Sequence, residues 1–158
     1  MNVLQIEHFK EAVGHFATGV VVVTAISNDR PVGFTCQTFG SLSIEPLLVS
    51  FSARTSSRTW PKIRETGRLA LNILSDDQQA LARNFATSAV NKFEDVAWTK
   101  APNGAPFLDG SLARLEGVVK QIGIYGDHDL AVVEIDYCET SPGLPLIYYR
   151  GDYGVPNL

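Results

Sequence analysis

The sequence predicts a mainly β protein, an antiparallel barrel with a few peripheral α-helices. About six or seven runs have the composition and pattern of short strands, whereas two or three segments have the apolar spacing of a helix. The strand-like runs come in clusters and do not alternate strictly with helices, which disfavours a doubly wound parallel sheet. A length of 158 residues suits one domain with its own core, so we expect a single domain over residues 1–158.

The first elements are a helix and a β-hairpin. Apolar residues recur at helical spacing at Ile6, Phe9, Val13, Phe16 and Val20. Gly19 is a suitable place for this helix to end. The run "VVVVTAI" (20–26) is rich in β-branched residues and too short for a helix, so it predicts a buried strand. A turn cluster at 27–31 makes residues 32–43 its expected hairpin partner.

The middle of the chain predicts two strands with a short helix between them. Residues 46–52 and 68–74 are apolar strand-like runs. The segment 53–67 begins with serines and threonines that can cap a helix. Pro61 suits the first turn of that helix, and Gly67 suits its end.

The second half predicts one more helix and a set of strands. Residues 75–86 begin with a capping box formed by Ser75 and Gln78. Residues 87–111 are predicted to be irregular, because "APNGAP" and "LDG" are turn signals. Two alternating runs, 111–123 and 129–139, predict half-buried strands. Residues 145–154 predict a last short strand and a tail.

Composition disfavours several classes of function. The formal net charge is -4 and the Lys and Arg residues form no basic run, so nucleic acid is not the expected partner. The apolar run at 19–26 has about half the residues of a membrane-spanning helix, and the N-terminus lacks signal-peptide regions. Cys36 and Cys138 share no metal-ligand spacing and predict free thiols in the cytoplasm.

The segment "SARTSSRT" (52–59) could hold a phosphate. It combines hydroxyl side chains, two arginines and an expected helix start within eight residues. Backbone N–H groups at a helix start attract anions, and an arginine can clamp a phosphate with two hydrogen bonds. The alternative is a plain helix cap with a solvated arginine, because serine-rich helix starts are common.

Two further segments could contact a planar ligand. The strand "GFTCQTFGSLS" (33–43) mixes hydrogen-bonding side chains with phenylalanines, as the edge of a heterocycle would require, although an ordinary barrel strand has the same pattern. His128 lies in the turn "GDH" between two aspartates and could donate a hydrogen bond to a carboxamide. The alternative is a turn histidine that faces solvent.

Taken in order along the chain, these segments resemble the flavin reductase family of FMN-binding split-barrel proteins. The resemblance runs from "FKEAVGHFATGVVVVTA" through "GFTCQTFGSLSIEPLLVSFS", "SSRTW", "LALNILSDDQQALARNFA", "GAPFLDGSLARLEG" and "GDH" to "YYRGDYG". It implies a homodimer of split barrels with FMN or FAD bound near the subunit interface. It also implies NADH or NADPH as co-substrate, and a flavin-dependent monooxygenase that receives the reduced flavin.

The resemblance also implies which residues bind. The expected flavin contacts are Thr35, Cys36, Gln37, Thr38, Ser41, Ser52, Ala53, Arg54, Ser57, Arg58, Thr59, Phe85 and Lys92. The expected nicotinamide contacts are Phe16, Thr18, His128, Tyr149, Arg150 and Tyr153, of which His128 would have the catalytic role. No metal is expected. A non-catalytic flavin carrier on the same barrel, or a barrel for another apolar ligand, is the competing interpretation.

Overall fold

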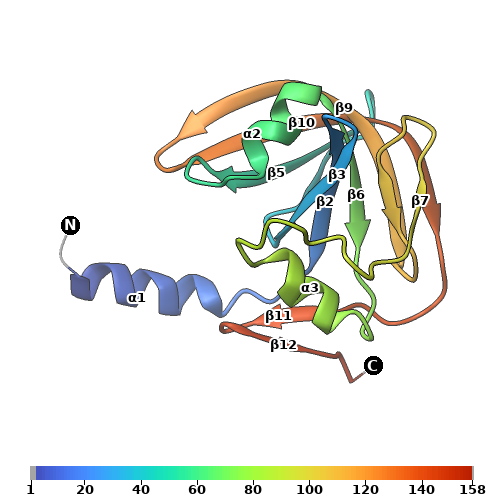
Figure 1. Cartoon of the computed structure of the whole chain (residues 1–158). Helices are drawn as coiled ribbons and strands as arrows, with labels where there is room; N and C mark the ends of the chain where they lie inside the picture. Colours follow the sequence, from blue (N-terminus) through green and yellow to red (C-terminus); the bar gives the residue numbers. More distant parts are fainter. Residues whose placement is uncertain (1–2, 158) are drawn as a thin grey trace.

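The computed structural model describes residues 3–157 and has a curled antiparallel sheet at its centre (Figure 1). In spatial order its seven strands are β3 (Arg30–Cys36), β2 (Val21–Ser27), β6 (Arg68–Ile73), β9 (Ala113–Tyr125), β10 (His128–Thr140), β5 (Leu48–Arg54) and β4 (Gly40–Ser43). Every neighbouring pair is antiparallel. The predicted mainly β, antiparallel fold class is therefore confirmed. The prediction of a single domain over residues 1–158 stays a prediction, and residues 1, 2 and 158 lie outside the described part of the chain.

The curled sheet is a barrel that stays open between its two edge strands, β3 and β4, because these strands are not paired with each other. The two edge strands are consecutive along the chain. The prediction of one strand over 32–43 was wrong: β3 ends at Cys36, and β4 starts at Gly40 on the opposite edge. In the linking segment, the Thr38 hydroxyl accepts a hydrogen bond from the Ser52 N–H (2.8 Å) and donates one to the Ser52 carbonyl (3.1 Å). The Thr38 side chain therefore fixes the segment between β3 and β4 against β5, because β3 and β4 are not hydrogen-bonded to each other.

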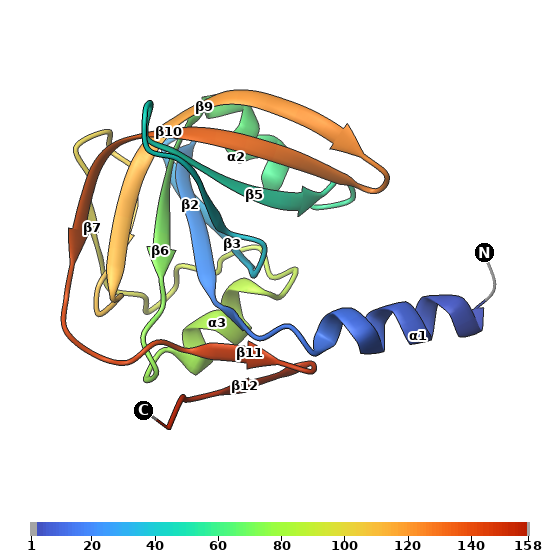
Figure 2. The ribbon, with the colours of Figure 1, turned by 180° about the vertical axis from the view of Figure 1, so that it is seen from behind.

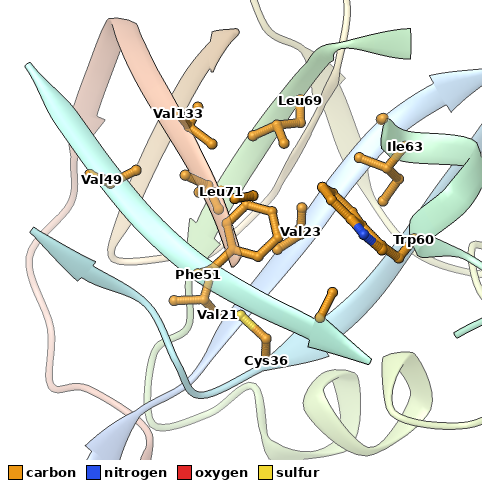
Figure 3. Close-up of a cluster of buried hydrophobic side chains, with 13 residues drawn as sticks. Val21, Val23, Cys36, Val49, Phe51, Trp60, Ile63, Leu69, Leu71 and Val133 are labelled. Atoms are coloured by element: carbon orange, nitrogen blue, oxygen red, sulfur yellow. The ribbon is translucent and has the colours of Figure 1, made fainter. Parts of the chain in front are cut away.

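The core fills the inside of this curled sheet. Burial alternates along β5, where Val49, Phe51 and Ala53 point inward. Trp60 enters from helix α2 (Trp60–Thr66) and packs edge-on against Phe51, with 5.4 Å between ring centroids (Figure 3). Helix α2 thereby closes one open end of the barrel.

The two short helices form where the sequence predicts them. Pro61 lies in the first turn of α2, and Gly67 ends the helix in the left-handed conformation with φ 70°. Helix α3 (Gln79–Phe85) starts later than expected. The predicted capping box is only half formed, because Gln78 accepts a hydrogen bond from the Ser75 N–H whereas the Ser75 hydroxyl donates to Asp77.

Helix α1 (Val3–Gly14) forms as predicted but ends five residues before the expected Gly19. Thr18 and Gly19 form strand β1, which pairs with β11 (Ile147–Tyr149). The helix projects away from the barrel (Figures 1 and 2). From residue 5 on, its apolar side chains Ile6, Phe9 and Val13 are exposed, and Phe9 is 65% exposed. None of the helices within residues 3–157 is long and apolar enough to cross a membrane.

The region predicted to be irregular contains a small hairpin, β7 (Trp98–Lys100) with β8 (Pro106–Leu108). A buried amide fixes it on the sheet: Asn72 donates to the Val22 carbonyl (3.0 Å) and accepts from the Leu108 N–H (2.8 Å). Local turn signals could not reveal this pairing, since it depends on a side chain from a distant strand. The last strand is likewise a hairpin, β11 with β12 (Asp152–Gly154).

Candidate functional site

A cleft of about 780 Å³ opens along the free edge of β3. Residues Arg54 to Lys62 form one wall, and the segment 85–93 after α3 forms the other. All the expected flavin contacts except Ser41 line it, namely Thr35, Cys36, Gln37, Thr38, Ser52, Ala53, Arg54, Ser57, Arg58, Thr59, Phe85 and Lys92. His128 also lines it, whereas Ser41 lies on β4 opposite Val49 and outside the cleft.

The cleft has a positive lining. Arg54, Arg58, Lys62 and Lys92 line it, and no Asp or Glu does so. Within residues 3–157, Arg54, Arg58 and Lys62 form no ion pair. Unpaired cations around a hollow favour an anionic ligand. Sequence reasoning missed Lys62, although its i, i+4 spacing from Arg58 was a usable signal.

The serine-rich loop both organises the start of α2 and leaves donors free. The Ser57 hydroxyl accepts hydrogen bonds from the N–H groups of Thr59 (3.2 Å) and Trp60 (3.1 Å), whereas Thr59, the N-cap residue of α2, makes no side-chain cap hydrogen bond. The N–H groups of Ser56 and Arg58 have no acceptor among the described residues. These donors and the Arg58 guanidinium remain available for a phosphate.

The histidine turn is attached to this loop. The Asp127 carbonyl accepts a hydrogen bond from the Thr55 N–H (3.0 Å), and His128 pairs with Arg54 across β10 and β5. The His128 Nδ1 lies 2.8 Å from an Asp127 carboxylate oxygen. The hydrogen bond and charge of His128 lower the pKa of Asp127. The turn 126–128 and the loop 54–59 are therefore joined, and His128 and Arg54 line the cleft side by side.

Lys92 joins the 85–93 wall of the cleft to strand β3. Its ammonium donates to the carbonyls of Gly33 and Phe85, each at 3.2 Å. Partial burial lowers the pKa of Lys92. Gly33 is required here, since a Cβ would lie 2.9 Å from the Val23 carbonyl oxygen and 3.0 Å from the Phe85 ring. An ammonium with a third N–H free can reach a bound acceptor.

The two cysteines are free thiols, as predicted. Cys36 lies at the base of the cleft, and burial raises its pKa to about 11. It is therefore a neutral thiol at physiological pH. Within residues 3–157, no group of three or more His, Cys, Asp or Glu side chains could hold a metal ion.

The other expected nicotinamide contacts lie outside the cleft. Phe16, Thr18, Tyr149, Arg150 and Tyr153 belong to the segment after α1, strand β1 and the β11–β12 hairpin. The Arg150 N–H donates to the Gly14 carbonyl (3.1 Å), which joins the hairpin turn to the end of α1. Within one chain, His128 is therefore separated from the rest of its expected group.

Helix α3 contacts both the cleft and the β11–β12 hairpin. On one side the Thr35 hydroxyl donates to the Ala82 carbonyl (2.7 Å) beside the cleft. On the other side Arg83 lies over the Tyr153 ring, 5.6 Å from its centroid, and 3.8 Å from a carboxylate oxygen of Asp152. The two groups of predicted residues are thus neighbours across α3.

Comparison with known proteins assigns this architecture. The sequence profile described as "Flavin reductase like domain" matches residues 13–156. The chain is 38% identical over 146 residues to the reductase subunit HsaB of a flavin-dependent monooxygenase from Rhodococcus jostii, covering 92% of this chain and 75% of that protein. It is 36% identical over 146 residues to SmoA, an FMN reductase (NADH) from Agrobacterium fabrum, covering 92% and 83%.

A solved structure has the same fold along nearly the whole chain. Nitrilotriacetate monooxygenase component B from Mycobacterium thermoresistibile superimposes with a TM-score of 0.95 at 34% identity, covering 98% of this chain and 88% of that one. The profile match spans most of the chain, and the relatives are similar over most of their own length. The chain belongs to the flavin reductase like domain family.

Proposed function

We propose that this chain is an NAD(P)H-dependent flavin reductase that passes reduced FMN or FAD to a separate flavin-dependent monooxygenase. The observation that supports this most is the single cleft that unites the β3 edge, the cationic loop 54–59 and His128. The relatives named above as an FMN reductase (NADH) and as a monooxygenase reductase subunit support the same reaction.

The residues present fit a flavin. Arg54, Arg58 and the free N–H groups of the loop bind the phosphate, while Thr35 and Gln37 on the β3 side border the ring. The bound flavin supplies the chemistry, because its ring accepts a hydride from a reduced nicotinamide. The protein contributes mainly alignment, and donors at the ring edge favour the negative charge of the reduced form. His128, which lines the same cleft, would donate a hydrogen bond to the nicotinamide carboxamide and so help to orient it.

We also propose a homodimer in the cytoplasm. Phe9 on α1 (65% exposed) and Phe16 in the segment that follows it (79% exposed) form an uncovered apolar surface of the kind that subunit interfaces bury. A partner packed on α1 could bring its β11–β12 residues to the cleft of this chain and so complete the nicotinamide site. Analytical ultracentrifugation tests the association directly, and a monomer at micromolar concentration would contradict it.

Anaerobic mixing tests the function. The purified chain is mixed with FMN or FAD, NADH or NADPH is added without oxygen, and bleaching of the flavin absorbance is followed. We expect bleaching with catalytic amounts of the chain. A yellow protein that binds flavin without bleaching it would instead be a carrier, and absence of any flavin binding would indicate a different ligand.

His128→Ala is expected to raise the Michaelis constant for the nicotinamide about tenfold, the loss of one good hydrogen bond. The flavin dissociation constant should stay within about twofold, because His128 contributes little to the phosphate end of the cleft. Steady-state kinetics and flavin titration measure the two quantities. Lys120→Ala is the control, since Lys120 is exposed on β9 and lies outside the cleft. An unchanged nicotinamide constant in His128→Ala would remove this residue from the mechanism.

A further inference from the structure

A second groove, of about 580 Å³, lies at the far end of α2, and the proposed reaction leaves it without a role. Six of the residues that line it are Asp29, Pro31, Thr66, Arg68, Trp98 and Lys100. They come from the β2–β3 turn, the end of α2 with the start of β6, and β7. Three separate parts of the fold therefore meet in this groove.

The groove combines three kinds of side chain. Trp98 is partly exposed there, while an edge-on contact with Phe93 at 6.1 Å between centroids holds its ring in place. Arg68 and Lys100 are exposed and form no ion pair with any residue from 3 to 157. The Asp29 carboxylate is also exposed and without a partner in that range.

Each of these groups matches one part of an adenosine phosphate. A fixed aromatic ring offers a stacking face to a purine base. A carboxylate accepts hydrogen bonds from ribose hydroxyls, as it does in dinucleotide-binding proteins. Arginine and lysine side chains bind phosphate oxygens. By contrast Asn103 is already used by the fold, since its amide donates to the Leu69 carbonyl (3.1 Å).

The second groove adjoins the flavin cleft. Pro31 lines both hollows. On α2, Lys62 lines the cleft and Thr66 lines the groove. These two residues are four apart and share one face of the helix, so their backbones are separated by about 6 Å along its axis. A ligand whose phosphate lies beside Lys62 can therefore continue along this face into the groove.

We propose that the second groove binds the adenylate half of a dinucleotide, with the base on Trp98 and the phosphate between Arg68 and Lys100. The proposal depends on the proposed function, because it extends the site in which the flavin is reduced. Both FAD and NAD(P)H carry an adenylate. The path from Lys62 to Thr66 favours FAD, whose flavin phosphate would lie at the start of that path.

Binding and kinetics of an Arg68→Ala/Lys100→Ala variant test the proposal. If the groove holds the adenylate of FAD, the dissociation constant for FAD rises about tenfold and that for FMN stays within about twofold. If it holds the adenylate of NAD(P)H, the Michaelis constant for NADH rises and that for reduced nicotinamide mononucleotide does not. Either result supports the groove as an adenylate site. The proposal would be overturned if the variant and the wild type had equal dissociation constants for FAD and FMN and equal Michaelis constants for NADH and reduced nicotinamide mononucleotide.

Two further measurements separate this proposal from the proposed function. Adenosine 5′-diphosphate should bind the wild-type chain and quench tryptophan fluorescence, and the quenching should be lost in Trp98→Phe, which keeps an aromatic ring against Phe93. This readout needs no flavin, so it reports on the groove even if flavin reduction is absent. Unchanged quenching in Trp98→Phe would contradict the proposal. Lys120→Ala is the control, because that lysine lies on β9 outside both hollows.

Discussion

Replacing Arg54 and Arg58 together with alanine is expected to raise the dissociation constant for FMN about 100-fold, since charge-assisted hydrogen bonds to a charged group contribute about 1.5–3 kcal/mol each. Both side chains line the cleft, and neither has a partner to hold it elsewhere in the described chain. Riboflavin has the same ring and no phosphate, so its affinity should change much less. Fluorescence titration with the two flavins measures this difference.

A charge-matched control is available on other surfaces of the molecule. Lys100→Ala/Lys120→Ala removes the same net charge from β7 and β9, outside the cleft. This variant should bind FMN nearly as wild type does, because exposed charges at a distance are largely screened by salt. If FMN and riboflavin lost affinity equally in the arginine variant, the loop 54–59 would not be a phosphate site.

Trp60→Ala is expected to lower the free energy of unfolding by about 3–5 kcal/mol, the range for truncating a buried aromatic side chain. Trp60 is 1% exposed and packs against Phe51, Phe34 and Ile63. Its indole N–H also donates to Asp129 (2.8 Å), which is 2% exposed. Urea denaturation followed by circular dichroism measures the loss.

Two conservative variants divide this effect into packing and polar parts. Trp60→Phe keeps a ring in the core but leaves Asp129 with only the Arg64 guanidinium, 3.0 Å away and half-exposed, so a loss of about 1–2 kcal/mol is expected. Asp129→Asn keeps an acceptor for the indole and should cost a similar amount. If Trp60→Ala lowered the free energy of unfolding no more than Trp60→Phe does, α2 would not close the barrel through this side chain.

Local pattern was sufficient to predict the elements whose stability depends on their own sequence. Strands β9 and β10 were predicted because apolar and polar residues alternate along both segments of the sequence, and burial alternates in the first half of β10, where Asp129, Ala131 and Val133 are buried. Helix α2 was evident because Pro61 and Gly67 mark its two ends. The cleft residues of segments 33–38 and 52–59 were implied by the resemblance to the flavin reductase family, because each segment alone also fits an ordinary strand or helix cap. The structure brings the two segments together through β5 and the Thr38 link.

Other features depend on contacts between distant residues. The change from β3 to β4 across the barrel depends on how the sheet curls, so the run 32–43 alone looks like one strand. Ser41, which the resemblance implied as a flavin contact, lies on β4 outside the cleft. The β7–β8 hairpin requires the buried Asn72 amide. The early end of α1 follows from pairing of Thr18 with Tyr148, which is far along the chain.

A crystal structure of the chain with FMN tests the central claim most directly. We expect electron density for the flavin phosphate beside Arg54, Ser57 and Arg58. We also expect density for the flavin ring along the β3 edge, with one face open toward His128. FMN bound at the β11–β12 hairpin, or elsewhere outside the cleft between β3 and the loop 54–59, would contradict it.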